Sequence, residues 1–165
     1  MEERVTFADI EGVQKKEKGT FGEVLAGIYL KSQIRQYPSL IADDVINEED
    51  PRLWISHIHG PTYLQRLCFE TGDDSEDNTV TWEPDFSFEA TLPDYDIRKR
   101  IFIEAKIGSS RPRGDQLVAM QLAADQMTPV KTTGLSQPTT PGERMVYLCQ
   151  LEFSQDAVSL SYEQI

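Results

Sequence analysis

Two neighbouring segments of opposite hydrophobic parity constrain the fold of this chain more than any other feature. Between residues 81 and 90 the even positions hold apolar side chains and a proline: Trp82, Pro84, Phe86, Phe88 and Ala90. Between residues 100 and 107 the odd positions are apolar: Ile101, Ile103, Ala105 and Ile107. Alternation with a period of two is typical of a β-strand that buries one face. The turn-forming residues at 92–96 connect the two segments, so the pattern predicts a β-hairpin.

The parity also limits the register of this hairpin. Residues that lie opposite each other share a face, so an even apolar position must pair with an odd one. Pair numbers that sum to 189 satisfy the pattern and leave residues 92–97 as the loop, although a shift by two residues would also preserve the parity. This register predicts Trp82 opposite Ile107. On the polar face it places Asp85 beside Glu104, with Lys106 one step along the strand.

Helical periodicity precedes the hairpin. Phe21, Val24, Leu25 and Ile28 follow the i, i+3, i+4, i+7 spacing, which predicts a helix over residues 20–36 with that face buried. Residues 61–69 predict a further short helix.

After the hairpin, residues 115–127 predict a second long helix whose core stripe is Leu117, Met120, Ala124 and Met127. Gln121 falls within that stripe. Residues 128–142 predict a loop, whereas 145–153 and 157–162 resemble strands.

Length and charge narrow the functional classes. The 165 residues show no repeat and no change of composition, which predicts one domain over residues 1–165. The longest apolar run, residues 24–30, is far shorter than the roughly 20 residues of a membrane span, so no membrane partner is expected. The first residues lack the pattern of a secretory signal, which predicts a cytoplasmic protein. A net charge of -12 argues against nonspecific coating of nucleic acid, so any such contact needs local basic residues or a metal.

The polar face of the hairpin carries the residues best suited to catalysis. Asp85 and Glu104 side by side would repel each other unless a cation lay between them, and oxygen ligands suit Mg²⁺ or Mn²⁺. Lys106 could orient an attacking water and neutralise charge that develops on a phosphoryl group. This combination is typical of phosphodiester hydrolysis.

Pro84-Asp85, a spacer of 18 residues and then Glu104-Ala105-Lys106 resemble the motif of the PD-(D/E)xK nuclease superfamily. The resemblance covers roughly residues 20–151. It implies an α/β fold with a restriction-endonuclease-like core, in which helices flank a central mixed β-sheet. A glutamate often comes from the preceding helix in that family, and Glu23 fills that place.

The resemblance implies a metal-dependent DNA endonuclease in which Asp85, Glu104 and Glu23 bind Mg²⁺ or Mn²⁺ and Lys106 assists the attacking water. Gln121, or Gln116 in the same helix, would contact that water or the phosphate, although neither has the tyrosine four residues later that some branches carry. The basic residues that follow the E-x-K strand, Arg111 and Arg113, would bind phosphates. A homodimer is expected because cutting both strands of a duplex needs two sites.

Each assignment has a plainer alternative. Asp85, Glu104 and Lys106 could form a solvated sheet face with a cross-strand salt bridge. Thr20 and Glu23 match a capping box, and a glutamine of the second helix could simply bond to a loop. The alternative functions are a nuclease-fold binding or scaffold module that does not cleave, and an acidic interaction protein that mimics nucleic acid.

Overall fold

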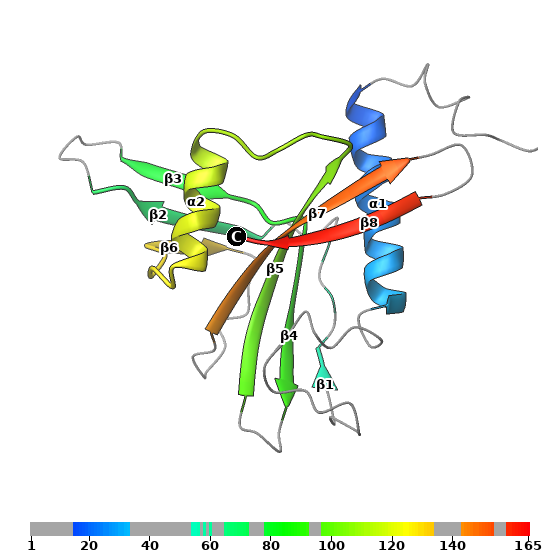
Figure 1. Cartoon of the computed structure of the whole chain (residues 1–165). Helices are drawn as coiled ribbons and strands as arrows, with labels where there is room; N and C mark the ends of the chain where they lie inside the picture. Colours follow the sequence, from blue (N-terminus) through cyan, green and yellow to red (C-terminus); the bar gives the residue numbers. More distant parts are fainter. Residues whose placement is uncertain are drawn as a thin grey trace, which may run out of the picture.

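The computed structural model describes residues 15–33, 54–56, 58, 60, 65–72, 78–92, 97–133, 143–153 and 158–165 (Figure 1). Within these residues the chain forms, in order, α1 Lys15–Gln33, β1 Trp54–Ile55, β2 Arg66–Glu70, β3 Thr79–Trp82, β4 Phe86–Leu92, β5 Ile97–Ile107, α2 Asp115–Ala124, β6 Lys131–Thr133, β7 Glu143–Phe153 and β8 Val158–Gln164. None of the described helices combines the length and hydropathy that a membrane span requires.

The strands form two sheets. The main sheet has the order β1-β4-β5-β7-β8, in which β5 and β7 are parallel and the other neighbours are antiparallel. The second sheet has the order β3-β2-β6 and is antiparallel. A mixed central sheet in an α/β fold is therefore confirmed.

The predicted hairpin register is confirmed between β4 and β5. Phe86 pairs with Ile103 and Phe88 with Ile101, so the pair numbers sum to 189 as expected. The ladder extends to the pair Leu92 and Ile97. The turn itself, residues 93–96, lies outside the described residues.

The prediction of one continuous strand over residues 81–90 is wrong. Trp82 is the last residue of β3 and pairs with Leu67 of β2, not with Ile107. Pro84 lies between β3 and β4 and has no N–H to donate to a strand ladder, so the chain leaves one sheet there and enters the other. The alternation of apolar residues continues through this crossover and hides it in the sequence.

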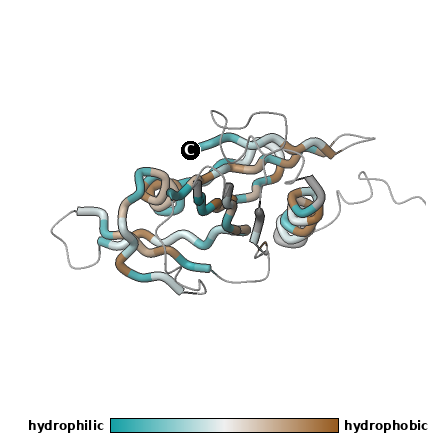
Figure 2. Tube along the Cα trace, turned by 90° about the horizontal axis from the view of Figure 1, so that it is seen from below, coloured by the Kyte–Doolittle hydropathy of each residue, from teal (hydrophilic) through white to brown (hydrophobic). Residues whose placement is uncertain are grey.

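The main sheet is covered on both faces. Figures 1 and 2 show α1 on one side of it and α2 with the second sheet on the other. The core against α1 includes Ala26, Leu30, Phe86, Phe88, Ile101, Ile103, Tyr147 and Leu151. The core against α2 includes Leu67, Phe69, Val80, Trp82, Phe102, Ala119, Met120 and Val146. The face of β5 that carries Phe102 and Glu104 is consequently buried.

The buried face of α1 differs from the predicted one. Phe21, Val24 and Ile28 are 39%, 43% and 58% exposed. The helix instead buries Gly22, Ala26 and Leu30, which recur every four residues. A Cβ added at Gly22 would lie 2.4 Å from Cδ1 of Ile107, so the helix backbone packs directly on β5. Close approach by small residues decides the orientation of α1.

The second long helix begins at Asp115 as predicted, but it ends at Ala124. Its buried residues are Ala119, Met120 and Ala123, whereas Met127 is 50% exposed. Gln121 is exposed, so its placement in the core stripe is wrong. The stripe fails because the smaller alanine face, not the face with Gln121, packs on the second sheet and β7.

Two further segments differ from the sequence predictions. Residues 66–69 of the predicted short helix belong instead to β2, whose Leu67 and Phe69 are buried. Residues 131–133, within the predicted loop, form β6 and pair with β2. The strands predicted at the end of the chain are confirmed as β7 and β8.

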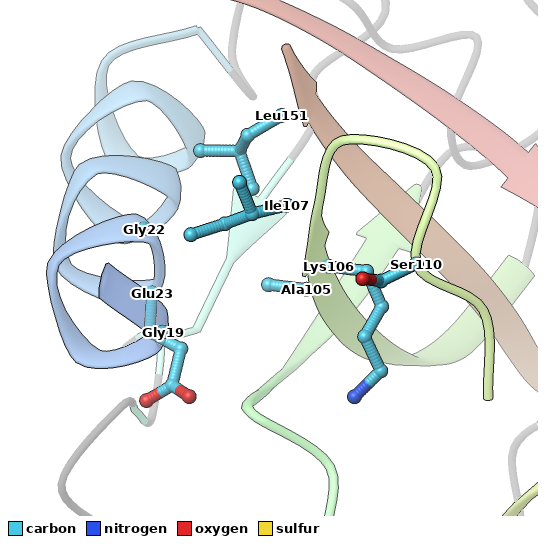
Figure 3. A pocket seen from close by; sticks show the side chains of 8 residues that line it. All are labelled: Gly19, Gly22, Glu23, Ala105, Lys106, Ile107, Ser110 and Leu151. Atoms are coloured by element: carbon cyan, nitrogen blue, oxygen red, sulfur yellow. The ribbon is translucent and has the colours of Figure 1, made fainter. Parts of the chain in front are cut away.

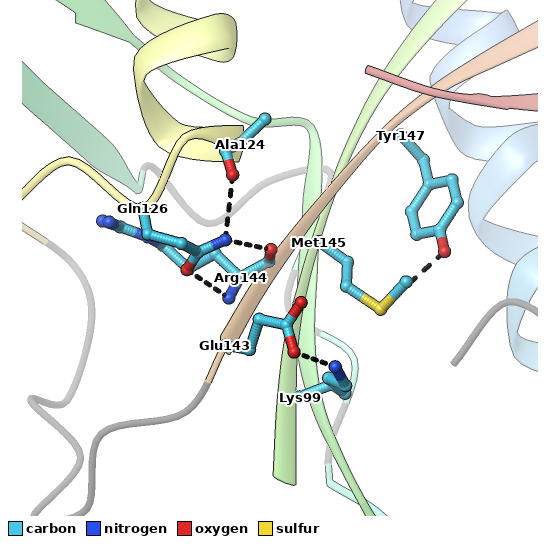
Figure 4. Close-up of polar contacts among 7 residues, drawn as sticks. All are labelled: Lys99, Ala124, Gln126, Glu143, Arg144, Met145 and Tyr147. Atoms are coloured by element: carbon cyan, nitrogen blue, oxygen red, sulfur yellow. Dashed lines mark hydrogen bonds and ion pairs between the residues drawn. The ribbon is translucent and has the colours of Figure 1, made fainter. Parts of the chain in front are cut away.

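The turn after α2 is fastened to the start of β7 (Figure 4). The side chain of Gln126 accepts a hydrogen bond from the backbone N–H of Arg144 and donates one to its carbonyl, both at 2.8 Å. Lys99 of β5 and Glu143 of β7 form an ion pair beside this contact. These contacts fix α2 against the parallel strands that carry the candidate site.

Candidate functional site

The sequence-predicted carboxylates and lysine come together around the C-terminal end of β5. Glu104 and Lys106 belong to β5 itself, and Asp85 immediately precedes β4. Glu23 comes from α1, which packs on β5. The structure thus brings together four residues that lie up to 83 positions apart in the chain.

Glu104 is the centre of this cluster. Its side chain lies between the main sheet and α2, and the residue as a whole is only 2% exposed. Oε2 accepts a hydrogen bond of 2.8 Å from Nε1 of Trp82, and Oε1 accepts one of 2.6 Å from Nε2 of Gln116. Lys106 donates to the same Oε1. The alternative of a solvated sheet face is therefore wrong for Glu104.

Lys106 has an ammonium group in contact with one buried carboxylate and an accessible side facing the solvent. Its side chain is 24% exposed, whereas that of Glu104 is 3% exposed. A charge pair at the border between core and solvent keeps the lysine available to a ligand while Glu104 stays fixed. Burial and the charge of Glu104 raise the pKa values of Glu23 and Asp85, and the charge of Lys106 partly offsets both increases, so it reaches both carboxyl groups.

Asp85 is held by the backbone of β5. Its Oδ2 accepts a hydrogen bond of 2.7 Å from the N–H of Ala105. Burial, and after it the negative charge of Glu104, raise the pKa of Asp85 to about 8 against the opposing effect of the Ala105 hydrogen bond. The cluster therefore holds more negative charge than its neighbouring lysine neutralises.

Gly60 makes room for Asp85. It has a φ of 116°, and a Cβ at this position would lie 1.9 Å from the carbonyl oxygen of Asp85. Only a glycine can pass so close to the start of β4. The sequence offered no sign of this contact, because the segment around Gly60 shows no alternation.

Glu23 belongs to α1 and faces the same cluster. Partial burial raises its pKa, and the charge of Glu104 raises it further. The capping-box alternative is wrong, because α1 begins at Lys15 and Thr20 lies inside the helix. Glu23 is therefore an interior helix residue directed toward β5.

A cavity of about 280 Å³ separates α1 from the end of β5 (Figure 3). Its lining residues are Gly19, Gly22, Glu23, Ala105, Lys106, Ile107, Ser110 and Leu151. Figure 3 shows the carboxylate of Glu23 and the ammonium of Lys106 at one end, with Ile107 and Leu151 at the other. The charged end of this cavity is open to a polar ligand.

Gln116, and not Gln121, is the glutamine of α2 that reaches the cluster. Gln116 lies in the first turn of the helix, next to the loop that leaves β5, and bonds to Glu104. Gln121 is more than a turn further along and exposed. Proximity to the end of β5 is the sequence signal that distinguishes the two.

The loop between β5 and α2 carries Arg111 and Arg113, both exposed. Arg111 forms an ion pair with Glu163 of β8. Ser110, at the start of the same loop, lines the cavity. The two arginines therefore lie on the segment that connects Lys106 with Gln116.

The donor set of the cluster suits a hard divalent cation, since Asp85, Glu104 and Glu23 offer only carboxylate oxygens. Burial and, after it, mutual repulsion raise the pKa values of Glu23 and Asp85, and such a cation would relieve the repulsion. In the part of the chain that the structure describes, however, no three His, Cys, Asp or Glu side chains converge closely enough to hold a metal together. The donor chemistry therefore fits such an ion, while the described carboxylates do not form a group of three around one point.

Comparisons with known proteins complete the description of the site. No family model, no curated protein and no solved structure matches this chain. Any function assigned to the candidate site therefore rests on the geometry and chemistry of its own residues.

Proposed function

We propose that the chain is a metal-dependent endonuclease that hydrolyses phosphodiester bonds of DNA and has a restriction-endonuclease-like core. One observation carries the proposal: Glu104 is buried at the end of β5 with Lys106 bonded to it, while Asp85 is tied to the intervening residue Ala105. The cavity beside this cluster is lined by Lys106, by Ala105 and by the carboxylate of Glu23.

Asp85 and Glu104 would hold Mg²⁺ or Mn²⁺, with Glu23 contributing through water. Such an ion would lower the pKa of a bound water and withdraw charge from a phosphoryl oxygen. Oε2 of Glu104 accepts one hydrogen bond and keeps capacity for another ligand. The donor set therefore remains compatible with the cation after the hydrogen bonds to the protein are counted.

The protein side chains would divide the remaining work. Lys106 would orient the attacking water and neutralise charge that develops on the phosphoryl group. Gln116 would keep Glu104 in place through its hydrogen bond to Oε1. Arg111 and Arg113 would bind neighbouring phosphates, and a homodimer would present two such sites to a duplex.

A second candidate function is a nuclease-fold module that binds without cleaving. One observation favours it: the donors of Trp82, Lys106 and Gln116 satisfy Glu104 without a metal. A buried carboxylate with this many donors is a stable structural group in its own right.

Cleavage assays separate the two functions. The full chain is incubated with supercoiled DNA, linear DNA, single-stranded DNA and RNA, with Mg²⁺ or with a chelator. The endonuclease proposal expects Mg²⁺-dependent nicking of supercoiled DNA that Glu104→Gln abolishes. Glu152→Gln is the matched control, because it removes the same charge from an exposed position of β7 and should cleave normally. Mg²⁺ binding without cleavage of any substrate would favour the module that does not cleave.

A further inference from the structure

Trp82 connects the second sheet to the candidate metal site. It is the last residue of β3, is 1% exposed and packs edge-on against Phe102 of β5. Its indole N–H donates a hydrogen bond of 2.8 Å to Oε2 of Glu104. A buried indole needs an acceptor, but here the acceptor is the central carboxylate and not a backbone carbonyl.

The two carboxylate oxygens of Glu104 accept different numbers of hydrogen bonds. Oε1 accepts hydrogen bonds from Lys106 and Gln116, whereas the described partner of Oε2 is Trp82 alone. A carboxylate oxygen accepts about two hydrogen bonds. Oε2 is therefore the oxygen with room for a cation, and Trp82 is the residue that fixes where this oxygen lies.

The same tryptophan also lies close to Asp85 in the chain. Asp85 follows Trp82 by three residues, in the crossover between the sheets. This short segment is tied to consecutive residues of β5: Trp82 bonds to Glu104, Asp85 bonds to Ala105 and Phe86 pairs with Ile103. A movement of Trp82 would shift both carboxylates relative to each other.

We propose that Trp82 is a positioning residue for the metal site, holding Oε2 of Glu104 and the crossover of Asp85 in the arrangement that binds a divalent cation. The inference builds on the proposed function, since it assigns a role around the same carboxylates. Partners behind metal ligands typically change metal affinity by about 10-fold to 100-fold when they are lost.

Calorimetric titration of Mg²⁺ and Mn²⁺ into Trp82→Phe tests this role. Phenylalanine preserves an aromatic ring in the core but removes the N–H donor, so the affinity should fall about 10-fold or more. Phe102→Leu is the matched control, because it reduces packing in the same core without touching Glu104. Unchanged affinity in Trp82→Phe, or an equal loss in both variants at equal loss of stability, overturns the proposal.

A second readout follows the indole N–H itself by nuclear magnetic resonance. The chain has two tryptophans, so Trp82→Phe identifies the resonance by its disappearance. This resonance should shift in Glu104→Gln and should shift progressively as Mg²⁺ is added to the wild type. If the resonance responds to Mg²⁺ but no nucleic acid is cleaved, the proposed endonuclease function fails and the role of Trp82 stands. If cleavage depends on Mg²⁺ but the resonance does not move, the role of Trp82 fails and the function stands. If the resonance does not move and no nucleic acid is cleaved, both proposals are overturned.

Discussion

Asp85 and Glu104 share one cluster but are satisfied unequally by the protein. Glu104 accepts hydrogen bonds from three side chains, whereas the described partner of Asp85 is the single N–H of Ala105. Burial, followed by the charge of Glu104, raises the pKa of Asp85 to about 8, and the single hydrogen bond from Ala105 only partly offsets this. Without a cation, Asp85 therefore carries the proton of the cluster at neutral pH.

This proton predicts how the stability of the cation-free protein depends on pH. Because the pKa of Asp85 rises from 3.8 to about 8 on folding, its contribution is fully present below pH 3.8 and is lost as the pH rises toward 8. The side chain of Asp85→Asn cannot lose a proton. As the pH rises between these values, the free energy of unfolding of the wild type should therefore fall relative to that of the variant. Urea unfolding in chelator across this pH range measures the difference. A difference that does not change with pH would contradict the prediction.

Replacement of Lys106 by methionine should separate metal binding from catalysis. Lys106→Met keeps the aliphatic stem but removes the ammonium that contacts Glu104. We expect single-turnover cleavage at saturating Mg²⁺ to fall by about 100-fold or more, the scale of one lost electrostatic contact in a transition state. Calorimetry should find Mg²⁺ affinity retained. Cleavage at the wild-type rate would exclude the assigned role of Lys106.

The sequence predicted part of the site because the relevant signal is local. Asp85, Glu104 and Lys106 were grouped by parity and register alone, and β4 and β5 pair in that register. Trp82 and Gln116 reach Glu104 from the second sheet and from α2, so their roles depend on how separate elements dock. The nearness of Gln116 to the end of β5 in the chain is a signal for that residue, but no pattern of apolar residues in either segment encodes the docking.

At the level of elements, α1 shows how close packing can override a hydrophobic pattern. Its larger apolar residues face outward in part, and Phe21 stacks on Phe153 with ring centroids 6.4 Å apart. The buried face is small because Gly22 packs on Ile107. The periodicity predicted the helix, but it could not reveal that β5 accepts only a small residue there.

Two glycines of α1 provide a matched pair for testing this contact. Gly22→Ala forces a methyl group against Ile107, and overpacking of this kind costs about 1–3 kcal/mol. Gly19→Ala meets nothing within 4 Å and should stabilise the helix by about 0.5–1 kcal/mol. Urea unfolding measures both changes. Equal effects of the two substitutions would show that α1 does not pack closely at Gly22.

The two glutamines of α2 form a second pair. Gln116→Ala removes a donor to Glu104 and should lower cleavage by about 10-fold, as losses behind a metal ligand do. Gln121→Ala, on the exposed face of the same helix, should leave cleavage unchanged. Initial rates at several Mg²⁺ concentrations compare them. A larger loss in Gln121→Ala would mean that substrate binds along the other face of α2.

At the scale of the whole molecule, many of the basic residues form ion pairs with acidic ones. Within the described residues, ion pairs join Arg66 to Glu83, Lys99 to Glu143, Arg100 to Glu89 and Arg111 to Glu163. Binding of a phosphate by Arg111 would therefore involve exchange of its partner Glu163. A requirement for such exchange favours selective phosphate contacts over a general attraction of nucleic acid to the protein surface. This agrees with the net charge of -12.

The crossover at Pro84 also has a consequence for the order of folding. β4 and β5 are adjacent in the chain and can pair early, whereas the bond between Trp82 and Glu104 forms only when the second sheet docks. The site would then be completed late, by the less stable of two cooperative units. Native-state hydrogen exchange should show that the amides of β2 and β3 open at a lower free energy than those of β5 and β7. Saturating Mg²⁺ should also slow exchange in β2 and β3, because a cation held by Asp85 and Glu104 would link the second sheet to the main sheet.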